Sequence, residues 1–158
     1  MKLIVDYVRT IAVSPEFAVV LASSGTLWLK PDWAKAIGQI GDVKGELLKW
    51  LFLLPIVMLG WVFNQSHQIL FPDARNRELL DDWPDYWRLR VVCNAARFYA
   101  VLFGAMGMSV WLESTTYLGS VRMFILLTAI VGTATTALSV DGAKSAVREV
   151  LHGRKRRP

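Results

Sequence analysis

Three long stretches of apolar residues limit the folds open to this chain. Residues 91–112 contain one charged side chain, Arg97, and residues 123–140 contain none. Residues 47–63 contain only Lys49, near the start of the stretch. A helix needs about 20 apolar residues to cross a hydrocarbon layer of about 30 Å, whereas a helix of a soluble domain has a polar side that these stretches lack. A soluble bundle would need three helices that are apolar all round in a chain of 158 residues, so the sequence predicts an all-α integral membrane protein.

A fourth segment, residues 12–29, is less decisive. Glu16 is its only charged residue. Ser14 followed by Pro15 and Glu16 is typical of a helix start, because a serine hydroxyl caps free amides, proline suits the first turn and an acid complements the helix dipole. We interpret the segment as a short membrane span; the alternative is a helix that lies partly in the membrane interface.

The predicted architecture is a single transmembrane bundle, residues 1–158, that ends in a short helical tail. A mixed segment, residues 32–45, has Trp33 at helical spacing with apolar residues and suits an interfacial helix. The basic tail, residues 141–158, begins as a helix, and Gly153 is expected to end it. The four expected spans are residues 12–29, 47–68, 91–112 and 120–140.

The distribution of lysine and arginine predicts the orientation, because cytoplasmic loops of membrane proteins are enriched in these residues. With four spans and both termini in the cytoplasm, 13 of the 18 basic residues lie inside. The five on the opposite side are Lys30, Lys35, Lys44, Lys49 and Arg122. Three spans would move only the N-terminal region to the outside, so a cytoplasmic C-terminus is predicted in both cases.

Four polar residues inside or at the end of the spans are candidates for a pore lining, namely Arg97, Asn94, Asn64 and His67. A charge in hydrocarbon is costly unless it reaches the headgroups, meets a partner or faces water. Arg97 is therefore either a pore or gating charge or a side chain that extends to the cytoplasmic headgroups. A single histidine without a second ligand at metal-binding spacing predicts no metal site.

Small residues recur every four positions on one side of the third span, at Ala96, Ala100 and Gly104, and Gly132 lies within a similar series on the last span. Such residues let helix backbones approach closely in a membrane. The pattern predicts helix packing, either within one chain or between subunits of a homo-oligomer.

The segment 73–90 is the longest polar connection between spans and is a candidate docking surface for a cytosolic protein. Tryptophan, tyrosine and arginine dominate binding hot spots. The alternative for the residues nearest the span is an aromatic belt at the membrane interface. The candidate docking residues are Trp83, Asp85, Tyr86, Trp87 and Arg88.

The C-terminal basic cluster consists of Arg154, Lys155, Arg156 and Arg157. Directly after a span, such a cluster is expected to bind anionic lipid headgroups and to fix the orientation. We expect no nucleic-acid partner.

The sequence shows no paired catalytic residues and no cofactor-binding motif, so we expect neither an enzyme nor a cofactor. In size and layout the chain resembles the small accessory or effector membrane proteins of bacterial stress and phage-defence operons, a resemblance of architecture alone. The resemblance implies the bacterial inner membrane. The expected function is association, as an oligomeric effector or pore or as an anchor or sensor for a cytosolic partner; the alternative is a small transporter or channel subunit, or an accessory of an intramembrane enzyme.

Overall fold

A computed structural model describes residues 12–40, 46–72, 83, 86–113 and 119–155, with the backbone alone at residues 38, 40, 46–49, 113 and 152–155. The described residues are almost entirely helical and contain no strand. In chain order the helices are α2 (Pro15–Leu29), α3 (Pro31–Ile40), α4 (Glu46–Leu70), α6 (Tyr86–Glu113) and α7 (Ser120–Lys155). The all-α prediction is confirmed for these residues.

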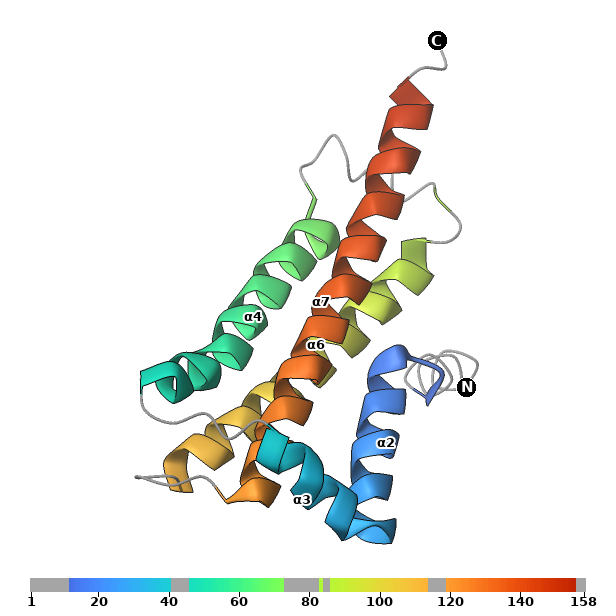
Figure 1. Cartoon of the computed structure of the whole chain (residues 1–158). Coiled ribbons are helices and arrows are strands. Elements are labelled where there is room, and N and C mark those ends of the chain that lie inside the picture. The colour runs from blue at the N-terminus through green and yellow to red at the C-terminus, as the bar shows by residue number, and fades with distance from the viewer. Residues whose placement is uncertain (1–11, 41–45, 73–82, 84–85, 114–118, 156–158) are drawn as a thin grey trace.

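Helices α4, α6 and α7 form the body of the bundle, and each packs against the other two (Figure 1). They run alternately up, down and up. We call the end where α4 finishes and α6 begins the upper end, as in Figure 1, and the opposite end the lower end.

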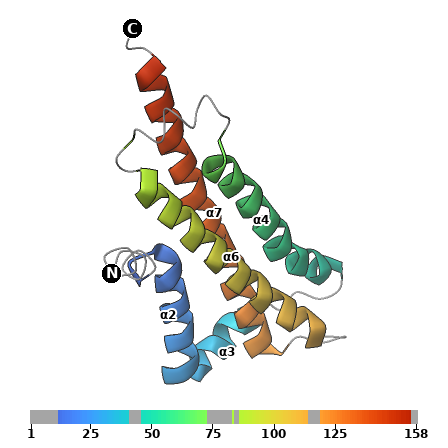
Figure 2. The ribbon, with the colours of Figure 1, turned by 180° about the vertical axis from the view of Figure 1, so that it is seen from behind.

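Helices α2 and α3 add a second, smaller layer beside α7. Helix α2 runs downward, in the same direction as α6, and α3 then turns back across the lower end of the bundle (Figures 1 and 2). The predicted start of α2 is confirmed: the Ser14 hydroxyl accepts a hydrogen bond from the backbone N–H of Phe17 at 3.2 Å, and Pro15 occupies the first turn.

The helices differ in length, and two of them are long enough to cross a membrane. Segments Tyr86–Leu112 in α6 and Ser120–Leu151 in α7 are long and apolar enough to cross a membrane. At 1.5 Å per residue, the 15 residues of α2 rise only about 22 Å, whereas the 36 residues of α7 rise about 54 Å. Helix α7 therefore continues past the upper ends of α4 and α6 (Figure 1). It ends at Lys155, beyond the expected stop at Gly153.

The interior is mostly apolar, and its buried threonine hydroxyl groups are paired within their own helix. Thr128, Thr133 and Thr136 of α7 donate to the carbonyl oxygens of Phe124, Ala129 and Gly132, each one turn earlier, at 2.8–2.9 Å. A buried hydroxyl that bonds in this way carries no unmet polar group into the core. These threonines therefore fill space between helices as small apolar residues do.

Among the described glycines, Gly132 has the tightest surroundings, at the contact of α6 with α7. A Cβ atom added to this glycine would fall inside the van der Waals contact distance of the Phe103 ring. Phe103 is itself fully buried. The ring thus occupies the volume that any larger residue at position 132 would need.

We expect Gly132→Ala to lower the free energy of unfolding by about 1–3 kcal/mol, the usual cost of overfilling a packed core. The only cysteine, Cys93, is buried, so labelling of Cys93 by a thiol-reactive dye during heating measures the unfolding temperature. Gly142→Ala is the control, since it lies in the same helix with open space around it and should gain up to about 1 kcal/mol of helix propensity. Equal unfolding temperatures for the two variants would contradict the packing.

Candidate functional site

The surface of the bundle exposes many large apolar side chains. Those at the lower end include Trp28, Trp33, Trp50 and Trp111, and Trp87 is exposed at the upper end. Trp87 and Trp111 lie 24 positions apart on α6, which corresponds to about 36 Å of helix. Tryptophans at two such levels are typical of membrane interfaces. Trp61, which is 40% exposed, lies between the two levels on α4.

The small-residue face of α6 is buried within the chain. Ala100 is fully buried and Ala96 nearly so. A Cβ added to Gly104 would lie 3.2 Å from Cδ2 of Leu59 on α4, and Gly132 meets Phe103 at the α6–α7 contact. All four predicted packing residues therefore lie at contacts between helices of one chain.

Arg97 lies on the flank of α6 that faces α4. Its guanidinium carbon is 5.5 Å from the centroid of the Phe63 ring, at the distance of a cation–π contact. The side chain is partly buried, and its Nε atom is buried without a hydrogen-bond partner among the described residues. Arg97 therefore lies at the edge of the packed core, with its Nε atom covered by protein.

The Arg97–Phe63 contact sets the register of the antiparallel pair α4–α6. One turn nearer the upper end, Asn94 on α6 comes level with His67 on α4, and both side chains are exposed. The His67 ring packs at 4.8 Å from that of Phe71. We call Phe63, His67, Asn94 and Arg97 the Arg97 cluster.

Asn64, the remaining candidate polar residue, is exposed. It is turned about 100° around α4 from Phe63, so it is not part of the Arg97 cluster.

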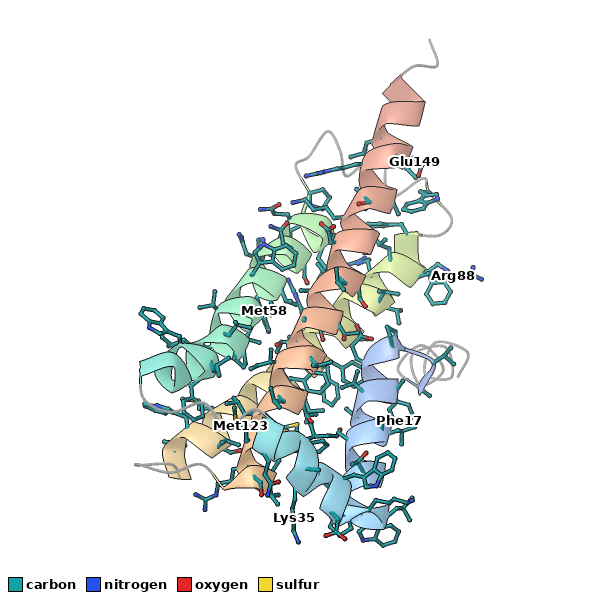
Figure 3. All side chains as sticks on the ribbon, in the orientation of Figure 1. Phe17, Lys35, Met58, Arg88, Met123 and Glu149 are labelled. Atoms are coloured by element: carbon teal, nitrogen blue, oxygen red, sulfur yellow. The ribbon has the colours of Figure 1, made fainter. Side chains whose placement is uncertain are left out.

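The candidate docking residues divide between the interior and the surface. Tyr86 is buried, and its hydroxyl donates to the carbonyl oxygen of Ile69 at 3.4 Å. Trp83 is partly buried and packs against the same core cluster. Trp87 is 39% exposed and carries the guanidinium of Arg88 at 5.9 Å from its ring, and Arg88 points away from the bundle (Figure 3). Asp85 lies outside the described residues.

The upper part of α7, from Asp141 onward, is joined to the end of α4 by polar contacts that the sequence did not predict. The Lys144 ammonium donates hydrogen bonds to the side-chain oxygens of Gln65 and Gln68, the latter at 3.1 Å. Ala143 and Val147 are buried on the inner side of this segment. Seventy-six or more positions separate the partners, so no local sequence signal could pair them.

The outer side of this upper part of α7 is charged. Arg148 and Glu149 are exposed there, and Figure 3 shows Glu149 on the part of α7 that projects from the bundle. Of the basic cluster, Arg154 and Lys155 lie in the last turn of α7, and Arg156 and Arg157 lie outside the described residues.

A cavity of about 250 Å³ lies where the start of α2 meets α6 and α7. Its walls include Val92, Ala95 and Ala96 of α6, Ser139 of α7, and Glu16, which is only 3% exposed. The sequence offered one signal for this site, a carboxylate in an apolar segment, but not the neighbours that bury it.

The Arg97 cluster, the exposed Trp87 and Arg88 and the cavity beside α2 are features suited to binding and helix packing. Within the part of the chain that the structure describes, no three His, Cys, Asp or Glu side chains gather as a metal site would require. Comparison of the chain with protein-family models, curated proteins and solved structures finds no match.

We expect Gly104→Leu to lower the unfolding temperature of the single chain without changing the mass of the purified particle, because the added side chain pushes against Leu59 of the same chain. Thermal unfolding and light scattering measure the two quantities. Ala105→Leu is the matched control, since Ala105 is the exposed neighbour. A smaller particle with unchanged unfolding would show instead that the face joins subunits.

Proposed function

We propose that this chain is a four-span membrane protein that works without catalysis, as an anchor for a cytosolic partner. The proposal rests on the arrangement of the upper end. There α7 continues beyond its neighbours, held by Lys144, while Trp87 and Arg88 stay exposed beside it.

Helix directions and charge support a topology with both termini in the cytoplasm. Helices α2 and α6 run one way and α4 and α7 the other (Figure 1). At the upper end lie Arg88, Arg90, Lys144, Arg148, Arg154 and Lys155, and at the lower end Lys30, Lys35, Lys49 and Arg122. The upper end is therefore the more basic and is proposed as the cytoplasmic side.

Helix α2 alone is shorter than a bilayer, since its rise is about 22 Å. Its start lies level with Ala95 and Ser139, below the upper end of α6.

The anchor is preferred to a self-assembled pore for two reasons. The small-residue face is occupied by α4 and α7 of the same chain. The interior between the long helices is filled by side chains such as Phe103 and Leu126. The pore is the second candidate, favoured by the position of Arg97 on an outer flank from which it could face a second copy.

The surface chemistry indicates the kind of partner. Trp87 offers a large aromatic face, and Arg88 and Arg148 add positive charge at the same end. An acidic protein surface with an apolar pocket for the indole would complement this end. The bacterial inner membrane is proposed as the location, on the resemblance in layout to small effectors of bacterial stress and phage defence.

The topology predicts that reporter fusions after Pro158 and before Met1 both read as cytoplasmic, and that a fusion within residues 41–45 reads as external. Resistance of the protein to alkaline extraction from membranes is measured on the same cells. An external N-terminal reporter would reduce the topology to three spans, and release by alkali would refute membrane insertion.

We expect the double change Trp87→Ala with Arg88→Ala to remove a specific partner from complexes cross-linked in native membranes, because it deletes the exposed indole and the charge that stacks on it. Quantitative mass spectrometry compares recovery with the wild-type chain. Trp111→Ala is the control, an exposed tryptophan at the opposite end of α6. If every captured protein is recovered equally with both variants, this end is not the anchor.

A further inference from the structure

We propose that the Arg97 cluster binds the phosphate of an anionic phospholipid at the flank formed by α4 and α6. The proposal rests on the membrane location given under the proposed function and is independent of the cytosolic partner.

Within the described residues, no ion pair joins Arg97 to a carboxylate. The only acids in α4 and α6 are the first residue of one and the last residue of the other, Glu46 and Glu113. Both belong to the lower end, and Glu113 is 16 positions from Arg97, about 24 Å along the helix. Glu16, the nearest buried acid, lies in the cavity beside α2, and no ion pair joins it to Arg97 in the described residues.

The Arg97 guanidinium contacts Phe63, but its Nε donor has no hydrogen-bond partner among the described residues. Phe63 covers one face of the group, which limits its orientations, and the buried Nε has no hydrogen-bond partner in the described segments. A buried donor left without a partner is costly. The terminal nitrogens of this partly buried side chain can donate two parallel N–H bonds to an oxyanion such as phosphate.

Arg97 lies ten positions, about 15 Å, after Trp87, so a phosphate bound to it lies below the level of that tryptophan. Arg97 lies seven positions, or about 10 Å, after Arg90, which is exposed near the upper end. Side chains of a helix lean toward its N-terminus, so the Arg97 guanidinium is directed toward the headgroup layer. Asn94 and His67 are exposed one turn higher, on the route by which a phosphate would approach. The open side of the cluster faces the proposed bilayer, where phospholipid is the anion at high concentration.

The site predicts a difference between arginine and lysine at position 97. Lysine keeps the charge but loses Nε and the planar pair of donors. Arg97→Lys should therefore bind anionic lipid more weakly than the wild-type chain and more strongly than Arg97→Gln.

The test uses the full-length chain in lipid nanodiscs of phosphatidylcholine containing a graded fraction of phosphatidylglycerol. Native mass spectrometry counts the phosphatidylglycerol molecules that stay bound, and the unfolding temperature is measured as a function of their fraction. We expect Arg97→Gln to weaken retention about tenfold or more, as for loss of a charged hydrogen-bonded pair. Arg90→Gln is the matched control on the same helix and should change retention by less than about threefold, since surface charges attract lipid only diffusely. Inorganic phosphate at millimolar concentration should not displace the lipid.

Retention by Arg97→Gln equal to that of the wild-type chain would overturn the site, as would equal losses for Arg90→Gln and Arg97→Gln. Displacement by inorganic phosphate would show an anion site that does not require lipid and would also overturn the proposal. Should Arg97→Gln fail to fold, Arg97→Lys and Phe63→Leu replace it, and wild-type retention by both would count against the site. Loss of lipid binding with normal partner capture, or the reverse, separates this proposal from the anchor function.

Discussion

The close contact between α6 and α7 at Gly132 is the interaction on which the arrangement of the bundle depends. Phe103 can lie flat against α7 only because Gly132 has no side chain there. With these two helices in close contact, α4 packs against both of them, and Leu59 and Pro55 meet Gly104 and Gly107. Van der Waals contact of this kind is what holds helices together where water provides no hydrophobic driving force.

That packing also sorts the polar groups. Threonine hydroxyls inside the bundle bond to their own helix, as those of Thr133 and Thr136 do, and therefore need no partner from another helix. Among the described residues, charged groups lie at the ends and flanks, except Glu16, which is buried beside the cavity at the start of α2. Lys144 finds amide partners on α4, whereas Arg97 finds an aromatic ring and leaves one donor unmet. The two proposals follow from this difference. The end of the bundle that Lys144 fixes can present a surface to a protein, and the flank that carries Arg97 can bind an anion.

The two ends of the molecule are built for different surroundings. The lower end is marked by exposed tryptophans, and α3 lies across it. The upper end is basic, and it is overtopped by α7, whose length exceeds the thickness of a hydrocarbon layer by about 24 Å. In the proposed membrane topology, a helix of this length is suited to carry a contact surface out of the membrane.

The sequence by itself determined the helical class, the four helical segments at the proposed spans and the capped start of α2, because apolar run length and local capping chemistry depend on neighbouring residues. It also marked Arg97 and the small-residue face as exceptional. It left open whether that face joins helices or subunits, because residue size says nothing about which partner fills the space. Only the tertiary structure placed Leu59 and Phe103 on that face, turned Tyr86 and Trp83 inward while Trp87 stayed outside, buried Glu16 and joined Lys144 to Gln65 and Gln68. These are contacts between residues far apart in the chain, and they follow from the register of packed helices, which no local pattern specifies.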